Sequence, residues 1–187
     1  MRKLIFALFL FCAVFSSAKT DAETTVELQK PQAIADSLPW FAIRELNDKN
    51  SPFTRTFLEK YAKTADRTAL VFFATWCMPC REGIVKLAKS KSELEEHNVK
   101  VILVNIGVRE VSEKKIRPWV AGLGAESFRV AYDPFKVMTE SFGLVEKSGE
   151  IALPKTLVLD KDAKPLFLLG QEGASDWPRV LWEKNPQ

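Results

Sequence analysis

Two cysteines carry the clearest chemical signal in the sequence. Cys77 and Cys80 are separated by Met78 and Pro79. They follow residues 69–74, a short continuous apolar run of the kind that forms a strand buried on both faces. Apolar residues at helical spacing come after them. The pattern therefore places Cys77 where a buried strand ends and a helix begins.

That position favours a reactive thiol. A sulfur at a helix start faces unpaired N–H groups and the positive end of the helix dipole, so the thiolate is stabilised. In Cys-x-x-Cys motifs the pKa of the thiol can fall from about 8.5 to between about 3.5 and 7.5. We expect Cys77 to be the exposed nucleophile. Cys80, one turn later, is expected to be a shielded thiol that attacks a mixed disulfide at Cys77. Pro79 suits the first helical turn, where a missing N–H costs nothing.

Two other interpretations of the cysteine pair stay open at this level. A structural zinc site needs about four ligands, and the chain offers one histidine, His97, beside its three cysteines. A purely structural bridge between Cys77 and Cys80 would close a very small loop and add little stability. We expect no metal and no cofactor.

The N-terminus has the pattern of an export signal. Residues 1–3 carry two positive charges, residues 4–15 form an apolar run of 12, and Ser16, Ser17 and Ala18 follow. We predict a signal peptide over residues 1–18, with a second candidate cleavage site after Ala22. An apolar run this short does not span about 30 Å of hydrocarbon as a helix. We therefore expect export to the periplasm or envelope without a stable membrane span; the alternative is a tether formed by an uncleaved signal.

Composition sets further limits. The chain has 187 residues, 47% of them hydrophobic and 27% charged, with a net charge of +3. This length predicts one globular domain, and the composition disfavours wholesale disorder. No long basic run is present, which argues against nucleic acid as a partner. A multi-span membrane protein is excluded because only one long apolar run stands out.

The remaining pattern predicts an α/β domain. We expect a polar segment over residues 19–35 and one domain over 36–187. Strand, helix and strand around the cysteines form a βαβ unit, which implies parallel pairing. The expected helices are 53–63, from the cysteines to about His97, 112–123, 134–143 and 175–183; the expected strands are 69–74, 99–106, 129–132, 156–159 and 166–169.

Two motifs together resemble a known family. Residues 76–80, Trp-Cys-Met-Pro-Cys, follow the apolar run, and residues 153–156, Leu-Pro-Lys-Thr, precede a hairpin pattern. This combination resembles the thioredoxin superfamily, and more closely the exported TlpA/ResA-type proteins, over roughly residues 36–183. The resemblance implies a thioredoxin-like fold, with a central mixed sheet flanked by helices.

The resemblance also implies roles for residues around the cysteines. Pro154 matches a cis-proline that lies against the active site, so that the backbone of Leu153 can pair with a substrate peptide. The alternative is an ordinary trans proline at a strand start. Trp76 is implied to cover the thiolate and to help dock partners, and Met78 is expected at the exposed apex between the cysteines.

Three positions depart from the patterns of related proteins. Val71 stands where cytoplasmic thioredoxins have a buried aspartate, and Leu103 stands where its lysine neighbour lies. Gly83 occupies the position at which TlpA/ResA-type proteins usually place a glutamate, and Glu82 comes one residue earlier. The proton acceptor for Cys80 is therefore left open between Glu82 and water.

The sequence thus predicts an exported thiol-disulfide oxidoreductase. It would reduce disulfides of envelope proteins through a mixed disulfide, and would receive electrons from a membrane thiol protein. One alternative is a Cu(I)-binding metallochaperone, since soft thiolates suit Cu(I). Another is a peroxidase, but the peroxidase motif is missing because Leu70 and Ala74 stand at its proline and threonine positions.

Overall fold

The computed structural model describes residues 28–29, 43–46, 52–53, 56–110, 112–146, 148–170 and 177–183. In chain order the elements are β1 (Leu28–Gln29), β2 (Arg44–Glu45), α1 (Thr56–Ala62), β3 (Arg67–Phe73), α2 (Met78–Lys89), α3 (Lys91–Glu96), β4 (Val99–Asn105), α4 (Glu113–Ala121), β5 (Arg129–Tyr132), α5 (Val137–Ser141), β6 (Lys155–Asp160), β7 (Pro165–Gly170) and α6 (Trp177–Glu183).

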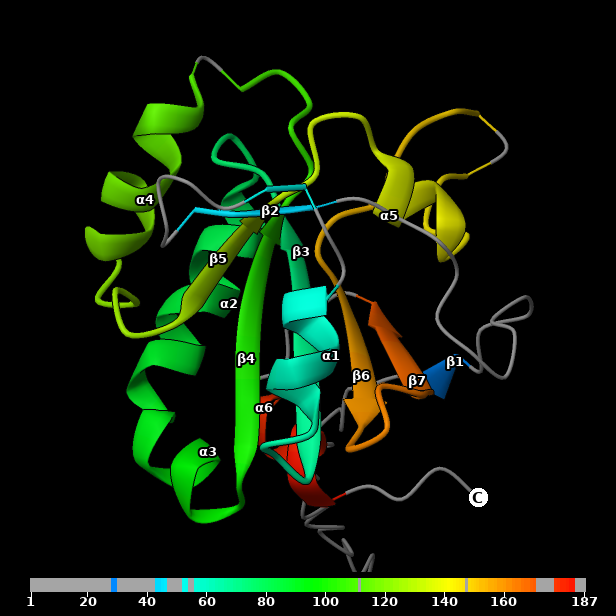
Figure 1. Ribbon diagram of the computed structural model, residues 1–187. Helices are drawn as coiled ribbons and strands as arrows, with labels where there is room; N and C mark the ends of the chain where they lie inside the picture. The colour runs from blue at the N-terminus through cyan, green and yellow to red at the C-terminus, as the bar shows by residue number, and fades with distance from the viewer. Residues whose placement is uncertain are drawn as a thin grey trace, which may run out of the picture.

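One mixed sheet organises these elements, in the strand order β1-β7-β6-β3-β4-β5-β2. Strands β3, β4 and β5 are parallel, whereas β6 pairs with β3, and β7 with β6, in the antiparallel sense. Figure 1 shows α1 in front of this sheet and α2 behind it. The expected α/β architecture and the βαβ unit around the cysteines are confirmed.

Strand β3 is central because it is apolar on both faces. Six of its seven residues are buried, and successive side chains of a strand point to opposite faces. The Phe73 ring stacks on Trp119 of α4 at 5.5 Å between centroids, whereas Phe72 meets Phe142 edge-on at 6.5 Å. Both faces are therefore covered, and the carboxyl end of β3, where the cysteine loop begins, is held between two packed layers.

Several element boundaries differ from the expectation. The helix after the cysteines ends at Lys89, and a second short helix begins at Lys91, with Ser90 capping both. The structure also places β1 inside the expected polar segment 19–35, pairing Leu28 with Leu169 of β7. Strand β2 lies at the other edge, against β5. A strand of two residues is too short to show an alternating pattern of apolar and polar residues. The sequence pattern therefore could not predict β1 or β2.

The predictions for the N-terminus lie outside the described residues. These are the signal peptide over 1–18, the alternative cleavage after Ala22, and most of the segment 19–35. Among the described residues, no helix is long and apolar enough to cross a membrane.

Candidate active site

Cys77 and Cys80 form a disulfide at the start of α2, with their Cα atoms 5.3 Å apart. Cys77 is the N-cap of the helix, and its Sγ accepts a hydrogen bond from the backbone N–H of Cys80 at 3.2 Å. A side chain that accepts from the third helical N–H satisfies one of the donors left open at a helix start. Pro79 lies in the first turn, as expected. On reduction, the same N–H and the helix dipole would stabilise a thiolate on Cys77 rather than on Cys80.

The expected contrast in exposure is small in this disulfide form. Cys77 is 5% exposed and Cys80 is 2% exposed, so both are buried, and the expectation of an exposed Cys77 is wrong for this state. Neighbouring apolar residues cover the bridge, and Cys77 joins the same buried cluster as Cys80. A partner can therefore reach the disulfide only past the residues on either side of Cys77. Trp76 is 48% exposed and Met78 is 61% exposed, so large apolar side chains on either side of Cys77 reach solvent.

The second motif meets the first at one end of the sheet. The peptide bond between Leu153 and Pro154 is cis, as the resemblance implied. Lys155, the first residue of β6, pairs with Phe72 near the end of β3. Pro154 is thus brought to the end of the sheet from which the cysteine loop leaves. Residues more than 70 positions apart in the chain come together there because β3 and β6 are antiparallel neighbours.

Beneath the cysteine loop the sheet is apolar. Val71 pairs in register with Leu103 of β4, and both are buried. Gly83, at the position of the usual glutamate, is buried on α2, whereas Glu82 is exposed. No charged group therefore replaces the missing acid on these elements. Burial in such apolar surroundings disfavours charge.

A carboxylate that the motifs did not reveal anchors the approach to Cys77. Glu110 lies in the loop after β4. Its Oε1 accepts hydrogen bonds from the backbone N–H of Thr75 at 2.7 Å and from the side-chain amide of buried Asn105 at 2.8 Å; its Oε2 accepts from the Thr75 hydroxyl at 2.5 Å. One feature of the sequence could have pointed to Glu110: it is an acidic residue soon after a strand that is parallel to β3. The carboxyl ends of parallel neighbours meet at one edge of a sheet.

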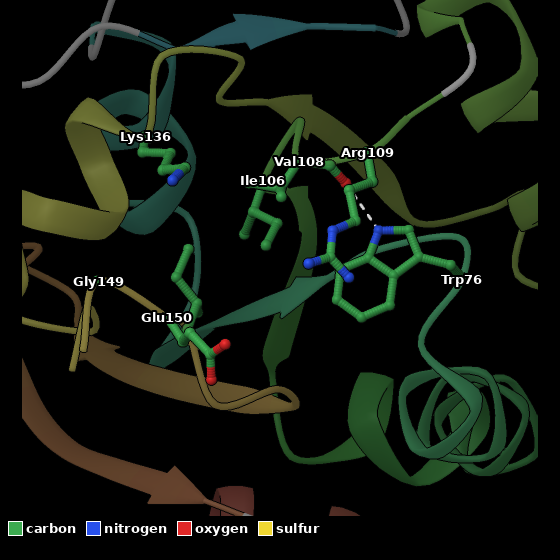
Figure 2. Close-up of a pocket in the computed structure, with 8 residues that line it drawn as sticks. Trp76, Ile106, Val108, Arg109, Lys136, Gly149 and Glu150 are labelled. Carbon is green, nitrogen blue, oxygen red and sulfur yellow. Dashed lines mark hydrogen bonds between the residues drawn. The ribbon is translucent and has the colours of Figure 1, made fainter.

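Trp76 is held by the same loop. Its indole N–H donates to the backbone carbonyl of Val108 at 2.7 Å, and the guanidinium of Arg109 lies 5.8 Å from its ring centroid. Figure 2 shows these contacts beside a cavity. The loop after β4 thus positions both residues that precede Cys77, Thr75 through Glu110 and Trp76 through Val108.

Asp133 is a buried acid close to this loop. It is fully buried, and its Oδ2 accepts hydrogen bonds from the backbone N–H of Thr139 at 2.9 Å and from the Thr139 hydroxyl at 2.8 Å. Burial raises the pKa of Asp133, while the hydrogen bonds from Thr139 partly oppose that rise. The carboxyl group connects the end of β5 to α5.

His97 lies away from the disulfide. It caps α3 just before β4 begins, and its ring stacks on Trp182 at 5.0 Å. Arg67, the first residue of β3, pairs with Val99, so His97 is at the opposite end of the sheet from the cysteine loop. Among the described residues, no group of three or more His, Cys, Asp and Glu side chains could hold a metal ion. This arrangement offers Cu(I) no histidine beside the two sulfurs.

Residues 34–164 match the AhpC/TSA family. The chain belongs to the AhpC/TSA family. The fold is thioredoxin-like, as the two motifs implied. The matched residues contain the cysteine loop, the loop after β4 and the cis-proline.

Individual relatives are more distant. The chain is 29% identical over 96 residues to the thioredoxin-like protein YneN of Bacillus subtilis, and this match spans 51% of each chain. The structure resembles that of a secreted thiol-disulfide isomerase from Corynebacterium glutamicum, with a TM-score of 0.61, 22% identity and coverage of 82% of this chain and 90% of that one. It also resembles a yeast mitochondrial 1-Cys peroxiredoxin, with a TM-score of 0.60, 18% identity and coverage of 80% and 73%. At these identities the structural matches establish the fold only.

Proposed function

We propose that this protein is an exported thiol-disulfide oxidoreductase that reduces disulfides of envelope proteins. The observation that carries the proposal is the Cys77–Cys80 disulfide at the N-terminus of α2, at the end of the sheet to which β6 brings the cis-proline. Export is supported by the pattern of residues 1–18 and by the secreted relative from Corynebacterium glutamicum. YneN, described as thioredoxin-like, supports the redox activity.

The reaction proceeds through two exchanges. The Cys77 thiolate attacks a substrate disulfide; a new S–S bond forms to Cys77, and the other substrate sulfur leaves as a thiolate. Cys80 then loses its proton and attacks the Cys77 sulfur, which closes the Cys77–Cys80 disulfide and releases the second substrate thiol. Two electrons pass from the dithiol to the substrate. A membrane thiol protein restores the dithiol by the same exchange in reverse.

Binding of the substrate chain is assigned to four residues. Trp76 and Met78 offer exposed apolar contacts on either side of Cys77. The backbone of Leu153, ahead of the cis bond to Pro154, is available to pair with an extended peptide. Pro79 and Glu82 have supporting positions in the first turns of α2, and Glu82 faces solvent.

A peroxidase is the second candidate, because the fold is as similar to that of a peroxiredoxin as to that of an isomerase. Seven and three residues before Cys77, the peroxidase motif would require proline and threonine. Here those positions hold Leu70 and Ala74, both fully buried. Neither side chain can donate a hydrogen bond to a peroxide. The geometry therefore supports disulfide exchange better.

One experiment separates the two activities. Purified Cys12→Ser protein, which retains only the motif cysteines, is supplied with dithiothreitol and either insulin or hydrogen peroxide. We expect insulin reduction that Cys77→Ser abolishes, and no catalysed loss of peroxide. Equilibration with glutathione buffers tests the direction, because a reductant should lie nearer the potential of thioredoxin, about −270 mV, than that of DsbA, about −120 mV. Peroxide turnover without insulin reduction would overturn the proposal.

A further inference from the structure

A cavity of about 420 Å³ opens beside the cysteine loop. Trp76 forms one wall, and Ile106 and Val108 line other parts (Figure 2). Ile151 also lines the cavity. The volume lies within the range of about 300–1,000 Å³ typical of ligand sites. Because Trp76 directly precedes Cys77, the cavity shares a wall with the cysteine loop.

Two cations line the cavity from different connections. Arg109 lies in the loop after β4, and Lys136 lies in the connection between β5 and α5. In the view of Figure 2, Ile106 lies between them. Among the described residues, no carboxylate lies within ion-pair distance of either side chain. Within the part of the chain that the structure describes, neither cation is therefore engaged in an ion pair, and both lie beside an apolar surface.

The backbone holds both cations in unusual conformations. Arg109 and Lys136 each have a φ of 57°, in the left-handed region that few residues other than glycine adopt. Gly107 joins the two connections: a Cβ on it would lie 2.6 Å from the Cα of Pro134. This close approach requires glycine. It sets the Arg109 loop against the segment that leads to Lys136, so the two backbone segments that carry the cations are held together.

The described lining has few other polar groups that could bind a ligand. The Trp76 N–H and the Val108 carbonyl bond to each other, so neither needs a ligand. Glu150 brings one carboxylate, so the charged lining residues that the structure describes, Arg109, Lys136 and Glu150, have a net charge of +1. An apolar surface with an excess of positive charge suits a short side chain that ends in a carboxylate.

We propose that this cavity binds an acidic side chain, Asp or Glu, of the substrate polypeptide, within a few residues of the cysteine joined to Cys77. Arg109 and Lys136 bind its carboxylate, and Trp76 and Ile151 contact its methylene groups. The inference rests on the proposed oxidoreductase function and specifies the substrates: disulfides flanked by acidic residues are reduced in preference to those flanked by basic ones.

Matched peptides test this specificity. Each peptide has one cysteine, blocked as a disulfide with neutral 2-mercaptoethanol, and differs only by Glu, Gln or Lys at the positions beside it. The measurement is the second-order rate constant for a single turnover, in which the pre-reduced Cys12→Ser protein is oxidised to the Cys77–Cys80 disulfide as it reduces the peptide. We expect the Glu peptide to be reduced about fivefold faster than the Lys peptide at low salt, with a smaller ratio at 0.5 M salt because exposed charges are screened.

Variants assign the preference to the cavity. Arg109→Gln and Lys136→Gln should each lower the Glu-to-Lys ratio toward one. Lys161→Gln, in the turn between β6 and β7, is the matched control and should leave the ratio unchanged. Thermal unfolding verifies that the variants fold. If one variant does not fold, the salt dependence of the Glu-to-Lys ratio in the protein with both cations intact still tests the proposal. Equal rates for all three peptides, or an equal effect of Lys161→Gln, would overturn this proposal. Failure to reduce even the Gln peptide would instead overturn the oxidoreductase function.

Discussion

The carboxylate of Glu110 accepts hydrogen bonds from both the backbone N–H and the hydroxyl of Thr75, a residue 35 positions earlier. The two oxygens of one side chain thereby fix the backbone two residues before Cys77. Asn105 donates to the same carboxylate and accepts from the backbone N–H of Gly107, so the contact continues into the loop that also holds Trp76. Cys77 is therefore positioned from the loop after the neighbouring strand as well as from its own helix.

The first prediction concerns this contact. Glu110→Ala should lower the free energy of unfolding by about 2 kcal/mol or more, because it leaves the Thr75 N–H and the buried Asn105 amide without their acceptor. Thr75→Val removes only the hydroxyl donor and should cost about 1 kcal/mol. Denaturant unfolding of the single and double variants provides the measurement. If the two losses simply add, the residues are not coupled and the contact does not position the loop.

The second prediction assigns the nucleophile. In the reduced Cys12→Ser protein, iodoacetamide should label Cys77 well before Cys80, because the Cys80 N–H and the helix start stabilise a thiolate on Cys77. Peptide mass spectrometry after brief labelling at pH 7 measures the ratio. Preferential labelling of Cys80 would reverse the two roles.

The third prediction concerns resolution. Cys80→Ser should accumulate a mixed disulfide between Cys77 and its partner, because no second thiol remains to attack the bridge. Capture on the tagged variant from an envelope extract, followed by elution with dithiothreitol, provides the measurement. Cys77→Ser is the matched control and should retain nothing. Retention on Cys77→Ser alone would place the attacking thiol at Cys80.

The fourth prediction concerns Glu82. Its exposed side chain lies on a different face of α2 from buried Gly83, so Glu82→Gln should change the rate of insulin reduction at pH 7 by less than about twofold. Removing a general base typically costs about 10²-fold or more. Glu96→Gln, on the exposed face of α3, serves as the control. A loss beyond tenfold in a folded Glu82→Gln variant would show that Glu82 takes the proton from Cys80.

The fifth prediction follows from Asp133. Since burial raises its pKa in the folded protein above the ordinary value of 3.8, the folded state binds a proton more readily than the unfolded chain. Its contribution to stability is therefore fully present below about pH 3.8 and is lost as the pH rises through the raised pKa. Asp133→Asn removes this titration. The stability of the unmodified protein relative to Asp133→Asn should fall between pH 3.5 and 7 in urea unfolding. A difference that is constant or rises with pH would contradict the shift.

Much of the site could be read from local patterns. Some features depend only on interactions within a few residues, and the spacing of residue types predicts these directly. They are the position of Cys77 at the helix start, Pro79 in the first turn and the buried strand before them. The apolar pair of Val71 and Leu103 followed from the family resemblance, and the βαβ pattern predicted that their two strands are parallel. The cis bond at Pro154 was implied by resemblance, because the local chain alone does not favour it.

Other features required the folded chain. The Glu110–Thr75 contact joins residues 35 positions apart, and no spacing rule connects them until β3 and β4 pair. Strands β1 and β2 exist because β7 and β5 supply their hydrogen bonds. The burial of Cys77 depends on neighbours packed from several elements. The cavity between Arg109 and Lys136 depends on the close approach of Gly107 to Pro134, which only the packing of two connections determines.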